Sequence, residues 1–110
     1  MLPKKFRLTK KEFEYLRSSG HVLLRSPIFV LVWCKAPALK FGISISAKVD
    51  KRAVYRNKVK RVLWDAVKFH LEKFPKGNFY GFLVKQDASK YSDEEINDLV
   101  NKAISKVSIS

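Results

Sequence analysis

The sequence predicts a small α+β domain, in which helices pack against a sheet of three or four strands. Two segments begin with a helix-capping pattern, and a third, longer segment has apolar residues at helical spacing. Three short apolar runs have the length of strands. In chain order the segments read helix, strand, strand, helix, strand, helix. A chain of 110 residues can bury one modest core, so we expect a single domain over residues 1–110.

The first helix is predicted in RLTKKEFEYLRSSG, residues 7–20. Thr9 stands at the N-cap position and Glu12 three positions later, which is the arrangement of a reciprocal capping box. Gly20 is expected to end the helix, because glycine tolerates the left-handed conformation that is common there. One face of this helix carries Phe13, Leu16 and Arg17.

Two strands are predicted next. In PIFVLVWC, residues 27–34, both alternating sets are apolar, which indicates an interior strand covered on two faces, with Cys34 as a buried thiol. In KFGISISA, residues 40–47, one alternating set is apolar and the other is small and polar. The second set consists of Gly42, Ser44 and Ser46. It has two interpretations: a solvated face or seat for a closely packed helix, or a groove floor where an extended ligand approaches the backbone.

The segment KRAVYRNKVKRVLW, residues 51–64, holds six cationic side chains and no acid, and it is predicted to begin a helix that continues to about Phe74. Asp50 is a candidate cap, and Pro75 and Gly77 end the segment. A projection at 100° per residue separates two arcs. The apolar arc holds Tyr55, Val59, Val62, Leu63, Ala66, Phe69 and His70. The opposite arc holds Asn57, Lys60, Arg61, Trp64 and Lys68, with Arg56 at the boundary.

Residues 78–85, NFYGFLVK, predict a third strand, and residues 91–107 predict the last helix. Ser92 and Glu95 form a second capping box. The apolar stripe of this helix consists of Ile96, Leu99, Val100, Ala103, Ile104 and Val107. Four acids lie in its first two turns, where the helix dipole favours them, so capping explains this cluster better than metal binding.

The net charge of +13 lies entirely in one half of the chain. Residues 1–61 hold sixteen Lys or Arg and three acids, whereas residues 62–110 hold seven of each sign. This imbalance predicts a polyanionic partner. A membrane surface is excluded, because the apolar arc of the basic helix has a sheet to cover. A helix placed between strands is more typical of RNA-binding modules than of DNA-binding helical motifs. Trp64 on the cationic arc either covers neighbouring protein or stacks on a base.

The sequence offers no catalytic apparatus of its own. No His, Asp or Glu group has metal-ligand spacing, and no glycine-rich loop precedes a helix to hold phosphate. His70 projects onto the apolar arc, where a packed histidine is expected rather than a general base. No apolar run approaches the roughly 20 residues that cross a bilayer, and the start has no hydrophobic signal core, so a cytoplasmic protein is expected.

The run FGISISAKVDKRAVYRNKVKRVLWDAVKFH resembles the signature of the bacterial ribonuclease P protein component. That signature is a strand ending in G-(I/V/L)-S-(V/I)-(S/A)-x-K, followed by a helix with R-N-x-(I/V/L)-K-R. The matching residues are Gly42, Ile43, Ser44, Ile45, Ser46, Lys48, Arg56, Asn57, Val59, Lys60 and Arg61. Further matches are Arg7, Leu8, Phe13 and Gly20 near the start, residues 78–85, and Tyr91, Ser92 and Glu95. Where the family commonly continues K-R-x-x-R, this chain has Trp64.

The resemblance implies an αβββαβα sandwich with a central four-stranded sheet and a left-handed crossover through the basic helix, like the second domain of ribosomal protein S5. It implies the protein subunit of an endonuclease whose partner RNA carries the chemistry. That RNA removes the 5′ leader of precursor tRNA with Mg²⁺, which is bound mainly by the RNA and the substrate. Catalytic side chains, a metal site and a protein partner are not expected in this chain.

The resemblance also assigns residues to two sites. The contacts to the catalytic RNA are expected from Lys48, Lys51, Arg52, Arg56, Asn57, Lys60, Arg61, Trp64 and Lys68. The cleft for the single-stranded leader, between the first helix and the sheet, is expected to use Phe13, Arg17, Phe29, Ser44 and Ser46. Two alternatives remain: a small ribosomal or RNA-chaperone protein without an enzymatic role, and an autonomous nuclease with His70 as its base.

Overall fold

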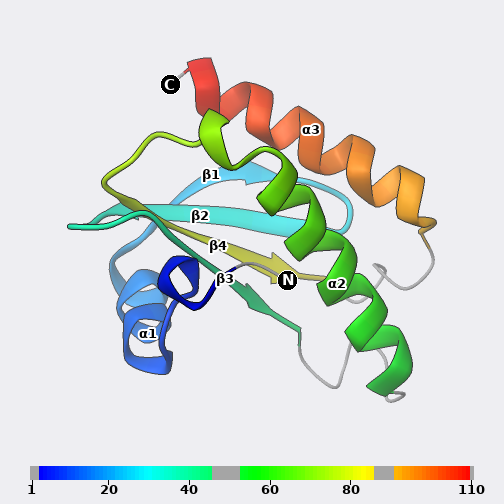
Figure 1. The fold of residues 1–110 in the computed structure, drawn as a ribbon, viewed down its shortest axis with the longest axis horizontal. Coiled ribbons are helices and arrows are strands. Elements are labelled where there is room, and N and C mark those ends of the chain that lie inside the picture. The colour runs from blue at the N-terminus through cyan, green and yellow to red at the C-terminus, as the bar shows by residue number, and fades with distance from the viewer. Residues whose placement is uncertain (1–2, 46–52, 86–90, 110) are drawn as a thin grey trace.

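The structure of this chain, a computed structural model, describes residues 3–45, 53–85 and 91–109, and the side chains of residues 53–56 and 107–109 are not described. The elements follow the predicted order αβββαβα (Figure 1). The helices are α1 (Lys10–Ser19), α2 (Ala53–Phe69) and α3 (Asp93–Ile109). The strands are β1 (His21–Arg25), β2 (Phe29–Lys35), β3 (Lys40–Ser44) and β4 (Asn78–Val84), and single 3₁₀ turns form η1 (Lys4–Phe6) and η2 (Leu71–Lys73).

The four strands form one mixed sheet in the order β1-β2-β4-β3. The pairs β1–β2 and β2–β4 are antiparallel, whereas β3 and β4 are parallel, with Gly42 opposite Gly81. Parallel neighbours need a crossover, and α2 supplies it. In Figure 1 α2 lies in front of β3 and β4, both strands point to the right, and β4 lies above β3. The crossover is therefore left-handed, as the family resemblance implied and against the usual right-handed rule.

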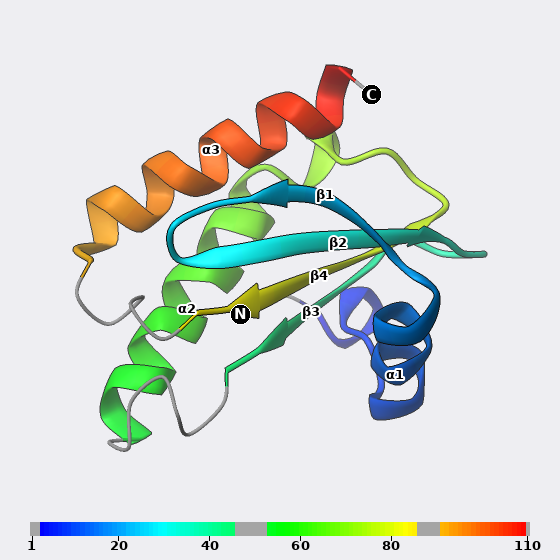
Figure 2. The same cartoon turned by 180° about the vertical axis from the view of Figure 1, so that it is seen from behind.

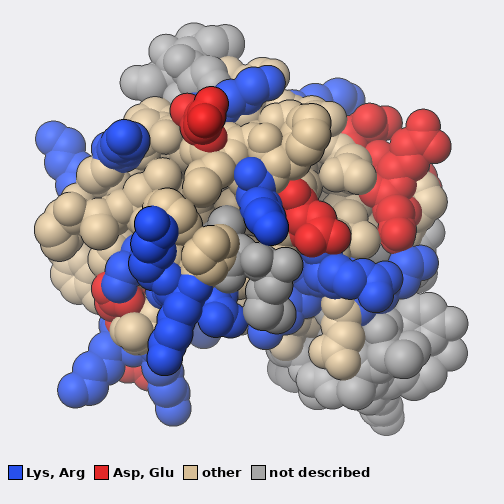
Figure 3. All heavy atoms as spheres, in the orientation of Figure 1, with Lys and Arg blue, Asp and Glu red and all other residues tan. Residues whose placement is uncertain are grey.

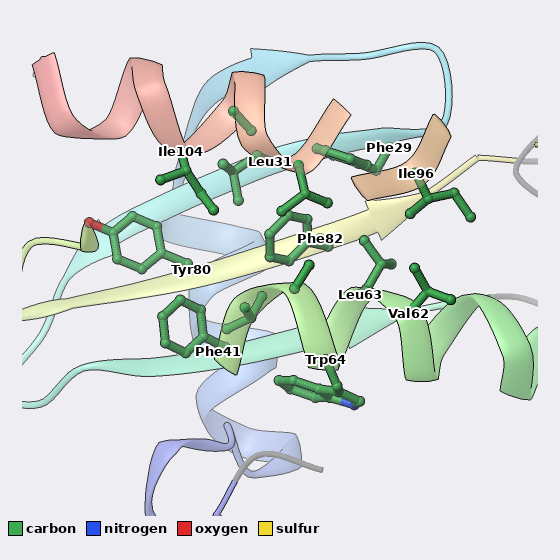
Figure 4. Packing of buried hydrophobic residues seen from close by; sticks show 14 of the residues in the cluster. Phe29, Leu31, Phe41, Val62, Leu63, Trp64, Tyr80, Phe82, Ile96 and Ile104 are labelled. Carbon is green, nitrogen blue, oxygen red and sulfur yellow. The ribbon is translucent and has the colours of Figure 1, made fainter. Parts of the chain in front are cut away.

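Helices α2 and α3 cover one face of the sheet, and α1 lies against the other, as the view from behind also shows (Figure 2). The main core lies between the sheet and the helix pair (Figure 4). The strands contribute Phe29, Leu31, Phe41, Tyr80 and Phe82, and the helices contribute Val59, Leu63, Val67, Ile96, Val100 and Ile104. Phe29 meets Phe82 edge to face, with ring centroids 5.1 Å apart. The prediction of β2 and β4 as strands covered on both faces is confirmed.

The second face carries a smaller core, in which Leu16 of α1 packs with Val32, Cys34 and Phe79. Burial raises the pKa of the Cys34 thiol. Glycines in the sheet let α1 come close. A Cβ atom on Gly42 would lie 2.3 Å from the Phe13 ring, and one on Gly81 would lie 2.8 Å from Leu16 Cδ2. The interpretation of Gly42 as part of a seat for a closely packed helix is therefore confirmed.

The ends of two helices differ from prediction. Gly20 ends α1 with φ −78°, in extended rather than left-handed backbone. Glycine is required there for space, because a Cβ atom would lie 2.4 Å from the Leu16 carbonyl oxygen. Helix α2 ends at Phe69 rather than Phe74, and the single turn η2 follows it. Phe69, expected on the buried arc, is 83% exposed, because it is the last residue of α2, beyond the part that packs on the sheet.

Both predicted capping boxes are present. In the first, Thr9 Oγ1 accepts from the Glu12 N–H at 3.2 Å, and Glu12 Oε1 accepts from the Thr9 N–H at 2.8 Å. Ser92 and Glu95 repeat the pattern before α3, at 3.2 Å and 3.0 Å. Lys40 Nζ also donates to Glu12 Oε2 at 2.9 Å, which ties β3 to the start of α1. The hydrogen bond from Thr9, together with Lys40, lowers the pKa of the Glu12 carboxyl.

The N-terminal segment covers part of the β3 edge of the sheet. Arg7 forms a parallel bridge with Phe41, and the Leu8 N–H donates to the Phe41 carbonyl at 2.8 Å. Phe6 packs against the main core. The chain therefore passes from the edge of β3 directly into α1, which lies under the sheet.

The Glu12 contacts predict a pH-dependent stability. A folded-state pKa below the ordinary 4.5 means that the carboxylate stabilises the fold fully above about pH 4.5, and that this contribution is lost as the pH falls through the lowered value. Glu12→Gln should reduce the free energy of unfolding by about 0.5–1 kcal/mol at pH 7. Near pH 3 the difference from wild type should shrink, as measured by urea unfolding at both pH values.

The control is Glu14→Gln, which changes an exposed carboxylate on the same helix. Glu14 takes no part in the capping box, so its replacement should change the free energy of unfolding at pH 7 less than Glu12→Gln does. A Glu12→Gln deficit of equal size at pH 7 and pH 3 would show that the charge of Glu12 does not stabilise the fold.

Candidate nucleic-acid interface

Helix α2 has a buried side and a cationic side. Val59, Val62, Leu63, Ala66 and Val67 are buried against the sheet and α3, whereas Asn57, Lys58, Lys60, Arg61, Asp65 and Lys68 are exposed. The buried side fixes the rotation of the helix, so the cations are held on a rigid support. Figure 3 shows Lys and Arg side chains across the lower half of this face, over the N-terminal and α2 regions.

Acidic side chains gather elsewhere on the same face, over the start of α3 (Figure 3). Asp93, Glu94 and Glu95 lie in the first turn of that helix, where the dipole favours them. Lys58 Nζ lies 3.4 Å from Asp93 Oδ1, which joins α2 to α3 through a half-exposed ion pair. The uneven charge predicted along the sequence is thus also uneven in space.

Three adjoining hollows meet at Lys60. The N-terminal groove, about 520 Å³, lies between the N-terminal segment, β3 and α2, and includes Arg7, Phe13, Gly42, Lys60 and Trp64. The Ser44 groove, about 370 Å³, is lined by Ile43, Ser44, Ile45, Asn57 and Lys60. The Trp64 groove, about 450 Å³, is lined by Asn57, Lys60, Arg61, Trp64 and Asp65. Shared lining residues make the three hollows one concave region along α2.

The N-terminal groove combines cations with an aromatic wall. Lys4 and Arg7 come from the N-terminal segment, Lys40 from β3 and Lys60 from α2, and the half-buried Phe13 lies against Gly42. The charge of Lys40 is partly neutralised by Glu12. Such a groove suits a strand of nucleic acid, because cations contact the phosphates while an aromatic ring packs against a base.

The Ser44 groove joins the two halves of the sequence motif. Ser44 lies at the end of β3, and Asn57 and Lys60 lie in the first half of α2. Strand and helix meet there because β3 runs parallel to β4 beneath the crossover helix. The hydroxyl, amide and ammonium groups together can bind phosphate, ribose or the edge of a base.

Of the residues expected at the leader cleft, Phe13 and Ser44 line grooves, and Ser46 lies outside the described residues. Arg17 is exposed on α1 and lines none of the three grooves. Phe29 requires a correction, because its side chain is fully buried in the main core. Its neighbours Val30 and Val32 in β2 face α1, so the alternation of the strand turns Phe29 to the opposite face of the sheet.

For Trp64 the structure shows the first of the two alternatives, in which the side chain covers neighbouring protein. Its side chain is only 5% exposed and belongs to the main core cluster, although the helical projection placed it on the cationic arc. The projection treats the arc opposite the core as solvent, but here the N-terminal segment lies beside it: Phe6 packs against the same cluster, and Leu8 lines the groove next to Trp64. Trp64 therefore packs on protein in this structure.

Several residues expected to bind the catalytic RNA cannot be placed. Lys48, Lys51 and Arg52 lie outside the described residues, as does the candidate cap Asp50. Arg56 lies in the first turn of α2, and its side chain is not described. Lys68 is exposed in the last turn of α2, beyond the three grooves. Asn57, Lys60 and Arg61 are the motif residues that the structure brings together.

Sequence reasoning missed the cations of the N-terminal segment and of β3. Lys4, Arg7 and Lys40 line the same groove as Lys60, although none of them was expected at a site. Their signal in the sequence is only the basic composition of residues 1–61. The bridge between Arg7 and Phe41 that places them is a long-range pairing with no local pattern.

Within residues 3–45, 53–85 and 91–109, no three His, Cys, Asp or Glu side chains gather in a way that could hold a metal ion. In the same part of the chain, no helix combines the length and apolarity needed to cross a membrane. His21 packs against Trp33, with ring centroids 5.7 Å apart. His70 is half-buried between η2 and α3, in a hollow lined by Lys73, Asn101, Ile104 and Ser105. No carboxylate lines this hollow among the described residues, and the Ser105 hydroxyl donates to the Asn101 carbonyl at 3.1 Å.

Known proteins share this sequence and fold. A sequence model of the family Ribonuclease P matches residues 2–108. A relative named ribonuclease P protein component, from a Nitratiruptor species, is 31% identical over 99 residues, covering 90% of this chain and 88% of that protein. Another of the same name, from Pelotomaculum thermopropionicum, is 27% identical over 71 residues, covering 64% of this chain and 62% of that protein. This second match thus spans less than two thirds of the relative.

The fold is also that of a solved structure from the same family. The Staphylococcus aureus RNase P protein superposes with a TM-score of 0.83 and is 25% identical, over 94% of this chain and 98% of that chain. The family match covers nearly all of the sequence, including the strand and helix that form the Ser44 groove. The chain therefore belongs to the ribonuclease P protein family.

Proposed function

We propose that this chain, as a single domain over residues 1–110, is the protein subunit of a ribonuclease P in which a partner RNA carries the chemistry. In this proposal the protein binds the catalytic RNA and the 5′ leader of precursor tRNA. It thereby assists the Mg²⁺-dependent cleavage that gives mature tRNA 5′ ends. The observation that carries the proposal is the meeting of three grooves at Lys60, on a helix whose apolar side is fixed by the core.

The two RNAs are assigned to different parts of this region. The catalytic RNA lies along the exposed side of α2, against Asn57, Lys60 and Arg61. Further contacts come from Lys48, Lys51, Arg52, Arg56 and Lys68. The leader enters the N-terminal groove, where Phe13 packs against a base and the cations contact phosphates. Ser44 extends this path at the end of β3, Arg17 on α1 contacts leader phosphate, and Ser46 is a further leader contact in this proposal.

The protein's contribution is electrostatic and geometric. Each phosphate that a lysine or arginine neutralises releases counterions, which favours association of the RNA. Lowering the repulsion between crowded phosphates also lets catalytic RNA and substrate approach each other. Mg²⁺ is held by RNA phosphates in this proposal, because the grooves present mainly amines and amides, whereas Mg²⁺ prefers oxygen ligands.

The catalytic-RNA contacts predict a change in salt dependence. Lys60→Ala and Arg61→Ala should each weaken assembly with the catalytic RNA and reduce the slope of log K against log salt by up to about one. Filter binding at several salt concentrations measures this slope. The control is Lys102→Ala, which removes an exposed lysine from α3, outside the three grooves. Slopes of all three variants equal to wild type would contradict the assignment of α2 to the RNA.

The leader assignment predicts a selective effect at Phe13. Because Phe13 lines the N-terminal groove, Phe13→Ala should weaken holoenzyme binding to precursor tRNA while binding to mature tRNA stays close to wild type. Base–aromatic stacking contributes about 1–3 kcal/mol per base, so a loss of about tenfold is expected. Tyr15→Ala is the matched control, because Tyr15 lies on the same helix, is 53% exposed and lines none of the grooves. Equal losses for both tRNAs would mean that Phe13 only supports the core.

Because the proposal assigns the cleavage chemistry to the partner RNA, it predicts that the protein alone does not cleave precursor tRNA. Purified chain with Mg²⁺ but without an RNA subunit should leave precursor tRNA intact, and cleavage should appear when the catalytic RNA is added. Gel analysis of 5′-labelled precursor measures both reactions. Specific leader removal by protein that has been treated with ribonuclease to remove bound RNA would contradict the proposal. His70→Ala would then test the alternative of an autonomous nuclease with His70 as its general base.

A further inference from the structure

The indole nitrogen of Trp64 is a buried hydrogen-bond donor with no partner among the described residues. The side chain is 5% exposed. A tryptophan N–H can only donate, and such groups are normally paired when they are buried, because burial without a partner forfeits the hydrogen bond to water. The apolar rings of the core explain why Trp64 is packed but not why its N–H is left unsatisfied.

The side chains around Trp64 in the two grooves are mostly hydrogen-bond donors or apolar groups. Trp64 lines both the N-terminal groove and the Trp64 groove, so it forms part of the wall between them. In Figure 4 its nitrogen is drawn on the side of the ring that faces away from Phe41 and Tyr80. Lys60 and Arg61, which line the Trp64 groove with it, carry donors only. Asn57 offers both kinds of group, and Asp65 is the single carboxylate of that groove.

We infer that Trp64 binds RNA through its indole N–H, which donates a hydrogen bond to a phosphate or ribose oxygen lying against Lys60. This inference rests on the proposed function and adds a contact that charge alone does not provide. The N–H is buried in the free protein, so binding requires a shift of the side chains that line the two grooves around it, Lys60 and Leu8 among them. One oxygen-rich strand would then satisfy Lys60, Arg61 and Trp64 together.

A neutral donor suits this position electrostatically. Trp64 lies one helical turn from Lys60 and one turn from Lys68, at spacings of four residues. The family signature commonly has arginine at this position, so a third cation is tolerated there, although like charges four residues apart cost the helix a little stability. The indole supplies a hydrogen bond without this repulsion, and its ring is retained by the core.

The test is Trp64→Phe, which removes the N–H and keeps an aromatic ring in the core. RNA binding should weaken about threefold to tenfold if the acceptor is a ribose oxygen, and by more than about tenfold if it is a charged phosphate oxygen. The smaller ring should lower the thermal stability of the free protein, and removal of an unsatisfied buried donor should offset part of this loss. The slope of log K against log salt should stay at the wild-type value, because no charge is lost. If Trp64 has a purely structural role, the folded variant should bind RNA as tightly as wild type.

Two controls separate this inference from the proposed function. Lys60→Ala should reduce the slope of log K against log salt, whereas Trp64→Phe should not. If Lys60→Ala leaves the slope unchanged, the proposed RNA contact of α2 is contradicted, whatever the result for Trp64→Phe. Trp33→Phe removes the N–H of a tryptophan on β2, outside the grooves, and should leave RNA binding at the wild-type level. Equal binding by wild type and Trp64→Phe, with the expected response of Lys60→Ala, overturns the inference alone.

The source of the oxygen is distinguished by two binding measurements on the same variant. A loss in assembly with the catalytic RNA assigns the acceptor to that RNA, whereas a loss for precursor relative to mature tRNA assigns it to the leader.

If Trp64→Phe does not fold, the Trp33→Phe protein leaves Trp64 as the single tryptophan fluorophore. Its emission should then move to longer wavelength when the catalytic RNA or the precursor is added. Unchanged emission with both RNAs overturns the inference.

Discussion

The cationic surface of this protein depends on the burial of the opposite side of α2. Each fully buried valine or leucine side chain, such as Val59, Leu63 and Val67, contributes about 1.5–3 kcal/mol. Repulsion between like charges one helical turn apart costs only about 0.2–0.5 kcal/mol per pair. Burial therefore outweighs repulsion by a wide margin, and the helix keeps its cations in one place without a bound partner.

The sheet determines where these cations meet a concave surface. The crossover brings α2 over the parallel pair β3–β4, and the glycines Gly42 and Gly81 let α1 approach the opposite face closely. The N-terminal segment then follows the β3 edge and completes the groove beside Trp64. The same contacts that stabilise the fold thus form the walls of the proposed RNA-binding region, and few flexible segments are needed to position its side chains.

Local signals in the sequence predicted most of the fold. The capping boxes at Thr9 and Ser92 are each formed within four residues. The sequence pattern alone therefore predicts the hydrogen bonds. Strands β2 and β4 were evident because both of their faces are covered by apolar contacts. Strand β1 is short, contains a register shift between Val22 and Leu24, and was expected only from the family resemblance.

The site was less predictable because it depends on contacts between distant segments. Phe29 was assigned to the wrong face of the sheet, since one step along a strand reverses the direction of a side chain and the apolar run of β2 gives no cue. The role of Trp64 stayed open between protein and RNA, because a helical projection contains no information about the N-terminal segment that lies beside it. The motif residues Asn57, Lys60 and Arg61 line one groove without help from distant segments, because one helix carries them all.

The surface combines two kinds of interaction with different physical consequences. Lysine and arginine attract any polyanion over several ångströms, and their effect weakens as salt is added. An N–H fixed in the core acts only on an oxygen that reaches hydrogen-bonding distance, and it is insensitive to salt. In the proposed complex, the first kind of interaction would bring RNA to α2, and the second would discriminate among the ways in which that RNA can lie. The indole N–H of Trp64, which has no partner among the described residues, would supply the second kind, so its proposed role is larger than the energy of a single hydrogen bond suggests.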